Sequence, residues 1–351
     1  MRTSTEPRHH IHGLGFGARL LRQTKLVVFT NAELSIHENG KQHVSQIGFT
    51  QWFRRFWQAA TVFGYPSPGC LLLGFARLFR PSAQRILVIF SGPSPDGSAM
   101  RHWWRVLAYR IGVWGATDVV AISTAAMVFV KHANASCRVW TSPVTVDMDF
   151  FCSIGSDASA EQMELPDKFY LVVGDYTRDD SFIYQALQGE PIPILRISRD
   201  PSIAQLVATI QKSSRGDRIL SKVSFGLLAR LYREAAVSIF VSRFDGWQPA
   251  GATSLSECLG CGGIAIAEGG GVIEADFGNL AKDAVGCPIR FFPRRNAAEF
   301  VRMVREMGCI DELERLKWRE QSRIFASRYL DIEHSFKVFE SVLEAKGAQE
   351  Q

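Results

Sequence analysis

The sequence predicts an α/β protein, because short apolar runs alternate with amphipathic segments along most of its 351 residues. Buried strands are expected at Lys25 to Thr30 (KLVVFT) and Arg85 to Phe90 (RILVIF), and residues 99–111 (AMRHWWRVLAYRI) are expected to form a helix. At roughly 150 residues per domain, the length indicates two such domains.

The rest of the first half continues this alternation. Strands are expected at 119–123 and 137–141. Residues 49–63 (FTQWFRRFWQAATVF) have helical spacing, with the aromatic residues on one face and Arg54 and Arg55 towards the other. Two interpretations of this predicted helix stand: its aromatic face packs into the core, or it lies at a membrane interface.

The most hydrophobic stretch of the chain is at residues 111–130. A transmembrane span is conceivable, but Asp118 lies within the stretch, with Gly and Thr around it. A buried strand followed by a helix is therefore the better interpretation.

The second half repeats the pattern. Strands are predicted at 169–174, 192–197, 219–220, 237–241 and 263–267, and helices at 181–187, 201–211, 224–236, 255–259, 297–307 and 311–348. Ser224 is a plausible N-cap of its helix, and a further helix can start at Val272. The predicted organisation is a flexible basic tail (1–23), an N-terminal Rossmann-like domain (24–150), a C-terminal one (151–330) and a C-terminal helix (331–351).

Charge is divided unevenly between the halves. Residues 1–150 carry 16 Lys+Arg against 7 Asp+Glu, and residues 151–351 carry 24 against 28, so the net charges are +9 and −4. Either this is chance scatter over a solvated surface, or the basic half meets an anionic partner such as a membrane surface, a phosphate-bearing acceptor or nucleic acid. No aromatic-basic motif of a nucleic-acid-binding module appears, so no nucleic-acid partner is expected.

Composition excludes several classes of protein. Apolar residues make up 46% and charged residues 21% of the chain, and mean hydropathy is near zero, which excludes fibrous, largely disordered and multi-span membrane proteins. The N-terminal MRTSTEPRHHIHG lacks the apolar core of a signal peptide. The seven cysteines are an odd number and are too sparse to indicate a disulfide framework. We expect a cytoplasmic protein with reduced thiols, among them the C-x2-C pair Cys258 and Cys261, which has no second pair to complete a zinc site.

Three loops after strands of the second half carry polar residues suited to a ligand. Ligands of open α/β sheets bind at the carboxyl ends of the strands. Glu257 follows the loop FDGWQPAGATS, and a carboxylate there can bind a ribose or sugar diol; the alternative is a surface glutamate. Gly269-Gly270-Gly271 can bring backbone N–H groups to a phosphate. Arg178 either pairs with a diphosphate or belongs to an exposed charged loop.

The segment VSFGLLARLYREAAVSIFVSRFDG, followed by SLSECLGCGGIAIAEGGGVIE, resembles the donor-binding domain of family-4 glycosyltransferases of the GT-B fold. VTVDMDFF, FYLVVGDY and the C-terminal HSFKVFESVL also resemble segments of that family, so the likeness covers about residues 117–345. It implies two Rossmann-like domains that face each other across a cleft, with the C-terminal helix crossing back.

The resemblance also implies residue roles. Glu257 would bind the nucleotide ribose, and Gly270 and Gly271 would cradle the diphosphate or sugar. The acidic-glycine loop, with Asp245 and Gly246, and Ser254 would complete the donor side. The first half would bind the acceptor. The residues predicted there are Gly40, which can meet the donor phosphates, and His102, which can act on an acceptor hydroxyl; each is otherwise a surface residue.

The predicted catalytic residues are therefore Asp245, His102 and Arg178. This sequence departs from the family at the family's paired glutamates, because Pro249 stands eight residues before Glu257. It also has Tyr176 where the family has arginine, and the usual lysine five residues further on is absent; Arg178, Arg196, Arg199 or Lys222 are the candidate substitutes, and Arg199 is assigned to donor binding.

The function implied is retaining, metal-independent transfer of a sugar from a nucleotide-sugar to a glycan or lipid-linked saccharide in surface polysaccharide biosynthesis. No cofactor or metal is expected beyond the nucleotide-sugar substrate. The protein would be cytoplasmic, with possible peripheral contact with the anionic inner face of the plasma membrane. The alternative is a catalytically altered relative that binds a nucleotide or glycan as a partner subunit.

Overall fold

The computed structural model describes residues 26–30, 36–38, 41–43, 61–64, 68–79, 81–93, 98–133, 137–153, 163–174, 178–198, 216–221, 223–243, 250–281 and 288–347. The chain divides into two compact units. The N-terminal unit combines the described residues up to Pro143 with those from Ile332 onward, and the C-terminal unit is Val144–Asp331.

The N-terminal unit is built on a sheet with the strand order β3-β2-β1-β4-β5-β6-β7. The strands are β1 (Leu26–Thr30), β2 (Ile36–Glu38), β3 (Lys41–His43), β4 (Thr61–Gly64), β5 (Gln84–Ile89), β6 (Asp118–Ala121) and β7 (Arg138–Thr141). The helices are α3 (Pro68–Phe79), α4 (Ala99–Gly115), α5 (Thr124–Ala133) and α14 (Ile332–Gly347). Strands β1 and β4 to β7 are parallel, whereas β2 and β3 form an antiparallel edge.

Two predictions for this unit need correction. The predicted helix at 49–63 is wrong at its end, because Thr61, Val62 and Phe63 belong to β4 and pair in parallel with β1 and β5. β-branched and aromatic residues suit a strand as well as an apolar helix face, so spacing alone misassigned them. Residues 49–60 lie outside the described part of the chain. The loop expected after the first strand contains β2 and β3, and helix α3 was not predicted.

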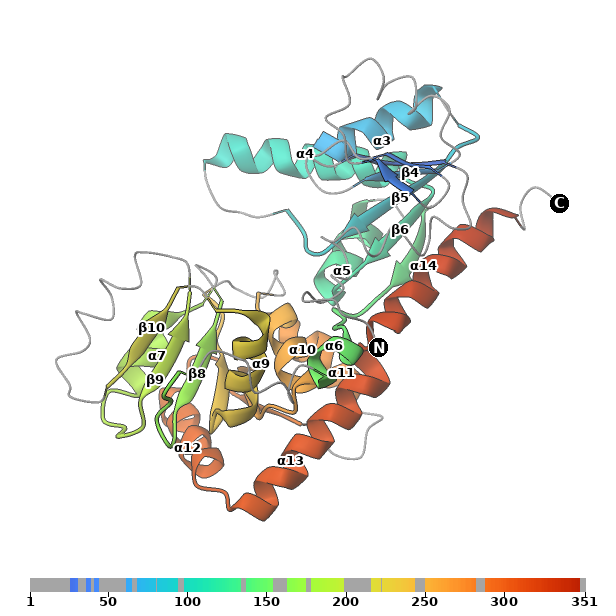
Figure 1. Ribbon diagram of the computed structural model, residues 1–351. Coiled ribbons are helices and arrows are strands. Elements are labelled where there is room, and N and C mark those ends of the chain that lie inside the picture. The colour runs from blue at the N-terminus through green and yellow to red at the C-terminus, as the bar shows by residue number, and fades with distance from the viewer. Residues whose placement is uncertain are drawn as a thin grey trace. The chain divides into compact units, whose positions relative to one another are not determined.

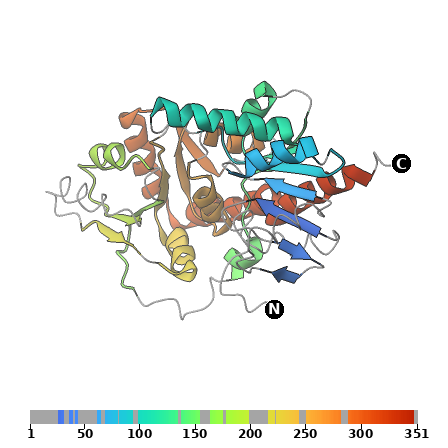
Figure 2. The ribbon, with the colours of Figure 1, turned by 90° about the horizontal axis from the view of Figure 1, so that it is seen from above.

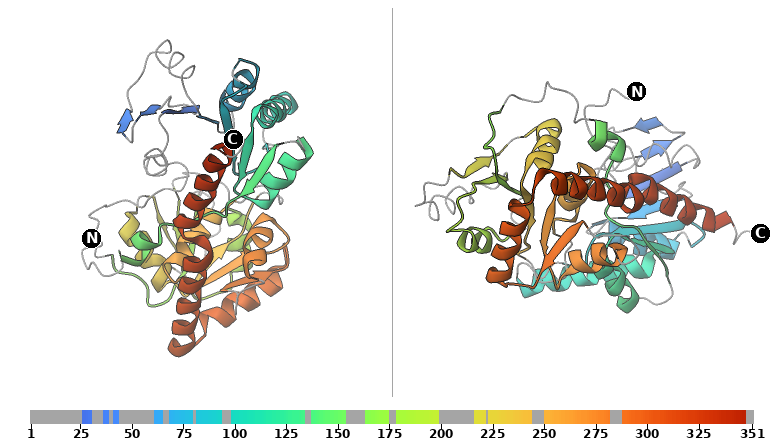
Figure 3. Two further views of the ribbon diagram at one scale, coloured as in Figure 1. Left: turned by 90° about the vertical axis from the view of Figure 1, so that its right-hand side faces the viewer. Right: turned by 90° about the horizontal axis from the view of Figure 1, so that it is seen from below.

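Helices α3, α4 and α5 cover one face of this sheet. Their buried residues share a core with the side chains of β5 and β6 that point to that face, such as Leu87 and Val119. On the other face, buried Asp118 pairs with Arg138, 2.8 Å away, and Gln84 donates to the carbonyl of Val342 in α14. Figure 3 shows α14, in the darkest red, beside this sheet. The buried strand predicted at 119–123 is thus confirmed, with bounds Asp118–Ala121, and the charge within the hydrophobic run is paired.

The C-terminal unit contains a fully parallel sheet with the order β10-β9-β8-β11-β12-β13. Its strands are β8 (Tyr170–Val173), β9 (Ile194–Ile197), β10 (Arg218–Leu220), β11 (Val237–Phe240), β12 (Ala265–Glu268) and β13 (Ile289–Phe292). Its helices are α6 (Met148–Ser153), α7 (Asp180–Ala186), α9 (Phe225–Glu234), α10 (Ala252–Gly260), α11 (Asn279–Ala281), α12 (Ala297–Gly308) and α13 (Glu312–Phe325), with π-helical segments at Glu274–Gly278 and Ala326–Leu330 (Figure 1).

Local sequence signals explain several of these elements. Ser224 caps α9, as predicted, by accepting a hydrogen bond from the backbone N–H of Leu227. The helix predicted over 311–348 is not continuous. Asp331 is extended, and the backbone N–H of Val146 donates to Leu330 at 2.7 Å, so the chain breaks between α13 and α14. Charged residues with helical spacing run through the break, which is why the sequence did not reveal it.

Among the described residues, no helix combines the length and apolar character needed to cross a bilayer.

Candidate functional site

The sheet of the C-terminal unit locates a ligand site by its strand order. Counted along the chain, β10-β9-β8-β11-β12-β13 is the doubly wound order 3-2-1-4-5-6. The order reverses between β8 and β11, and ligands of such sheets bind beyond the carboxyl ends of the strands at that point. We call this the carboxyl edge. The predicted residues Arg178, Gly270 and Gly271 all follow strands at this edge. Figure 2 shows the strands of this sheet in yellow-green to orange.

Arg178 ties the β8 loop to the loop after β11. It forms an antiparallel bridge with Ser242, and its Nε donates to the carbonyl of Val173 at 2.7 Å. Its guanidinium is packed against Gly174 and Gly251, where a Cβ would approach it to 2.9 and 2.5 Å. Only 3% of Arg178 is exposed, so in this structure its side chain is buried against Gly251, the residue before α10. Its proposed contact with phosphates stays a prediction.

Arg196, a candidate substitute for the family's phosphate-facing arginine and lysine, makes its hydrogen bonds to groups of the protein itself. It is fully buried, and its Nε and Nη2 donate to the two carboxylate oxygens of Asp180 at 2.7 and 3.1 Å. Nη1 donates to the carbonyls of Gly174 and Ile197 at 2.5 and 2.7 Å. This arginine therefore fixes the end of β8 and the start of α7, and it has no exposed surface for a ligand.

Arg295 is a site residue that the sequence reasoning missed. Its side chain is 38% exposed and forms ion pairs with Asp179, after β8, and with Glu268, at the end of β12. It also donates to the carbonyl of Ser242, after β11, at 3.3 Å. One guanidinium thus joins the ends of three strands. Among the described non-glycine residues, Arg295 alone has a positive φ, 55°. Strained backbone of this kind clusters at functional sites.

A sequence signal for Arg295 existed. Arg294 and Arg295 directly follow the run RFFP, at the end of β13. Without the strand order, however, two arginines after a strand indicate only an ordinary exposed turn.

The glycine loop after β12 is closed by a nearby carboxylate. The backbone N–H of Gly270, with φ 76°, donates to Oε2 of Glu274 at 2.6 Å. Gly271 faces open space, since a Cβ there would have no heavy atom within 4 Å. An anion bound at the Gly270 amide would replace the Glu274 carboxylate, to which this N–H already donates a hydrogen bond.

Glu257 and Ser254 lie on α10 beside α9. The hydroxyl of Tyr232 donates to Oε2 of Glu257 at 3.4 Å, and it also contacts Ser254. Burial raises the pKa of Glu257 to about 7, and the hydrogen bond from Tyr232 partly offsets the effect. A carboxyl with this pKa exchanges between its charged and neutral forms near neutrality, so it can accept and donate hydrogen bonds to a diol.

Glu257 and Ser254 contact Tyr232 rather than Arg295 or the glycine loop, and the other predicted site residues are not part of this group either. His102 lies in the first turn of α4 and belongs to the N-terminal unit. Asp245, Gly246, Gly40 and Arg199 lie outside the described residues. Cys258 and Cys261 are buried thiols, and burial raises the pKa of Cys258 to about 12; Cys309 is exposed.

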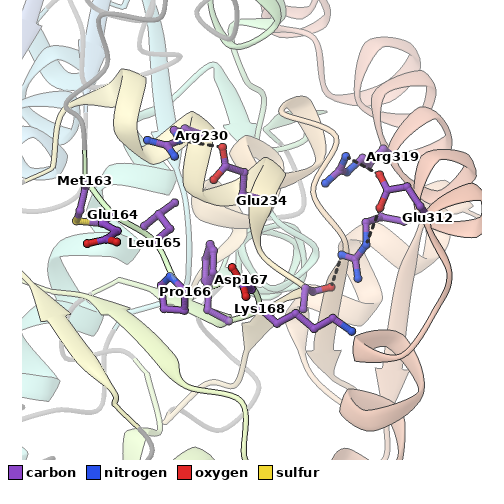
Figure 4. Close-up of a pocket in the computed structure, with 13 residues that line it drawn as sticks. Met163, Glu164, Leu165, Pro166, Asp167, Lys168, Arg230, Glu234, Glu312 and Arg319 are labelled. Carbon is purple, nitrogen blue, oxygen red and sulfur yellow. Dashed lines mark hydrogen bonds and ion pairs between the residues drawn. The ribbon is translucent and has the colours of Figure 1, made fainter.

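A surface depression of about 570 Å³ lies at the opposite edge of the sheet. It is lined by Phe169 and Ala236, which precede β8 and β11, so we call this the amino edge. Figure 4 shows Arg230 beside Glu234, 2.8 Å apart, and Arg319 beside Glu312, 3.7 Å apart. Each of these ion pairs joins neighbouring side chains of one helix. Ligands of doubly wound sheets bind at the opposite, carboxyl edge.

No protein-family model matches this sequence, and no curated protein matches it at the significance level applied. Solved structures do match. Sucrose-phosphate synthase from Thermosynechococcus elongatus aligns with a TM-score of 0.72 and 14% identity over 95% of this chain and 92% of that one. The α,α-trehalose-phosphate synthase (UDP-forming) from Burkholderia vietnamiensis aligns with a TM-score of 0.67 and 11% identity over 96% and 95%.

HepE from Anabaena, solved in complex with UDP-glucose, aligns with a TM-score of 0.65 and 12% identity over 85% of this chain and 81% of that one. This chain has the GT-B fold.

Proposed function

We propose that this protein is a GT-B glycosyltransferase of the family-4 type, which transfers a sugar from a nucleotide-sugar to a glycan or lipid-linked saccharide. The observation that carries the proposal is the carboxyl edge of the C-terminal unit. There Arg295 joins the loops after β8, β11 and β12, next to a glycine loop whose amide holds a carboxylate. A cation and backbone amides that converge at this place suit a diphosphate.

A nucleotide-sugar donor is further supported by the solved structures of similar fold. HepE was solved with UDP-glucose, and the trehalose-phosphate synthase is UDP-forming. In our proposal Glu257 binds the ribose, and Ser254, Gly246 and Arg199 complete donor binding. Gly40 meets the donor phosphates.

The proposed chemistry stabilises the departing nucleoside diphosphate by electrostatics. Arg295 releases Asp179 or Glu268 to meet the phosphates, and the Gly270 amide releases Glu274. Arg178, Asp245 and His102 are the proposed catalytic residues, with His102 acting on the acceptor hydroxyl. Transfer proceeds with retention and without a metal or cofactor. We place it in surface polysaccharide biosynthesis, in the cytoplasm, with the acceptor at the inner face of the membrane.

A partner subunit that binds a nucleotide or glycan without catalysis is the second candidate. This second candidate is favoured by the described cations at the carboxyl edge, whose charges are already paired. Arg196 is ion-paired with buried Asp180, and Arg295 is ion-paired with two carboxylates. In that case ligand binding persists, but the chain releases no nucleoside diphosphate from any donor.

The test is a thermal-shift panel with UDP, GDP, ADP, CMP and their common sugars. A ligand at 100 times its dissociation constant adds about 2.7 kcal/mol to the free energy of unfolding, which gives a visible shift. We expect one nucleotide to stabilise the wild type and Glu257→Ala to lose the response. Glu320→Ala, which removes an exposed carboxylate of α13, is the matched control.

Assay of nucleoside diphosphate release then separates the two candidates. Release from the nucleotide-sugar that stabilises the chain identifies a transferase. Binding without release in the presence of saccharide acceptors identifies the partner subunit. If no nucleotide shifts the melting temperature, the donor site itself is refuted.

A further inference from the structure

The helices that cover one face of the N-terminal sheet expose large apolar side chains. Met100, Trp103 and Trp104 of α4 are 66%, 53% and 57% exposed, and their spacing of i, i+3 and i+4 places them on one side of the helix. Every residue of α4 from 99 to 110 is at least partly exposed, and its buried residues are Gly112, Val113 and Gly115 near the end. The first two turns of α4 (99–106) therefore extend beyond the core, which Tyr109 is the first residue of the helix to contact.

Helix α3, which packs against the C-terminal end of α4, exposes further apolar side chains. Leu71, Leu78 and Phe79 are all more than half exposed. The two helices pack closely, since a Cβ on Gly74 of α3 would lie 2.5 Å from the side chain of Ile111 in α4. Arg77 of α3 also lies over the ring of Trp114, 4.3 Å from its centroid, and donates to its carbonyl. We call the exposed side chains of α3 and α4 the α3–α4 surface.

The charge of this layer has a single sign. Helices α3, α4 and α5 contain Arg77, Arg101, Arg105, Arg110 and Lys131, and they contain no Asp or Glu. Helix α13 of the C-terminal unit is different: it also exposes leucines, Leu313 and Leu316, but its arginines and lysine alternate with glutamates. An apolar surface with tryptophans and only basic charges is the composition of segments that lie in the interface of an anionic bilayer.

We infer that the α3–α4 surface docks on an anionic lipid membrane, with Trp103, Trp104 and the neighbouring apolar side chains entering the headgroup region and the arginines meeting lipid phosphates. A second copy of this chain fits less well, because two such surfaces face to face would bring like charges together. Nucleic acid would satisfy the arginines but leave the exposed leucines and Met100 in water. The inference extends the acceptor side of the proposed function, and its test needs no sugar transfer.

The experiment is co-sedimentation of the full chain with vesicles of phosphatidylcholine, with and without phosphatidylglycerol. We expect binding to the anionic vesicles alone, weakened by salt. The double variant Trp103→Ser/Trp104→Ser should bind at least about tenfold more weakly, because two large aromatic side chains no longer leave water. Arg101→Glu/Arg110→Glu should lose at least about fivefold per site, which corresponds to ~1 kcal/mol for each basic residue near an anionic surface.

Matched controls come from α13. Leu313→Ser/Leu316→Ser and Lys317→Glu remove exposed apolar and basic side chains from the C-terminal unit and should leave vesicle binding unchanged. The substituted residues on α4 are exposed, and unchanged circular dichroism and melting temperature verify that each variant folds.

Three outcomes would overturn the inference. These are no binding to either kind of vesicle, equal binding to both, or a wild-type dimer in sedimentation equilibrium that the tryptophan variant dissociates. A nucleotide thermal shift on the same preparation reports the donor site separately, so failure of vesicle binding is distinguishable from failure of the proposed glycosyl transfer.

Discussion

The two edges of the C-terminal sheet both carry arginines and carboxylates, but they organise them differently. At the amino edge, Arg230 and Glu234 are neighbours on one helix, and both are about one-third or more exposed. At the carboxyl edge, Arg295 joins groups that lie 116 and 53 residues away in the sequence. The amino edge also has long-range contacts, because Arg305 pairs with Glu190, 115 residues away, and Arg319 donates to the carbonyl of Arg233. What distinguishes the candidate ligand site is that one partly exposed arginine joins the ends of three strands. Four measurements sharpen or break this comparison.

The largest expected effect is on stability. Asp180→Ala leaves the fully buried Arg196 without its carboxylate, and breaking a buried pair by removing one partner costs about 3–5 kcal/mol. Glu234→Ala removes the amino-edge pair and should cost less than about 1 kcal/mol. Urea unfolding of both variants measures the difference. Equal losses would show that the carboxyl edge is no more tightly built than the amino edge.

The next effect is a pH dependence. The pKa of Glu257 is raised from 4.5 to about 7, so between these values the folded state binds more protons than the unfolded state. The free energy of unfolding therefore falls as pH rises through that window, by up to ~3 kcal/mol, and does not recover above it. Glu257→Gln has no such titration and should show a flatter profile. Identical profiles for the two proteins, from urea unfolding between these pH values, would refute the raised pKa.

A smaller effect is expected on ligand affinity. Arg295→Ala should weaken binding of the stabilising nucleotide by roughly 10- to 100-fold, the range that corresponds to loss of a charge-assisted hydrogen bond. Arg230→Ala, at the amino edge, is the control and should leave affinity unchanged. Titration calorimetry gives both values. If the control loses as much as Arg295→Ala, the assignment of the ligand to the carboxyl edge is wrong.

The last measurement separates backbone strain from crowding. Gly216 and Gly251 both have positive φ, 79° and 101°. A Cβ at Gly216 meets no atom within 4 Å, whereas at Gly251 it would lie 2.5 Å from Nη1 of Arg178. Gly216→Ala should cost about 1 kcal/mol, and Gly251→Ala about 1–3 kcal/mol more because Arg178 must move. Thermal unfolding checks this; a smaller cost at Gly251 would mean that Arg178 is not held in place.

The sequence alone predicted the alternation of strands and helices, the cap at Ser224 and the glycine loop, because these depend on residues close together in the chain. It also predicted a buried strand directly after Asp118, and the structure begins that strand at Asp118 itself. The spacing of apolar and charged residues gave a wrong prediction where the same pattern is compatible with two backbone structures. Thr61 to Phe63 suited a helix face and a strand equally, and charged residues continued with helical spacing through Asp331, where the helix breaks.

Only the tertiary structure decided what each arginine does. Arg178, Arg196 and Arg295 all follow or lie within strands and look alike in sequence. In the folded structure Arg178 is buried against Gly251, and Arg196 is ion-paired with buried Asp180. Arg295 stays partly exposed among three loops. The α3–α4 surface was equally hidden, because exposure of Trp103 and Trp104 depends on how far α4 extends beyond its core. Burial and convergence are properties of distant residues brought together, and no local pattern encodes them.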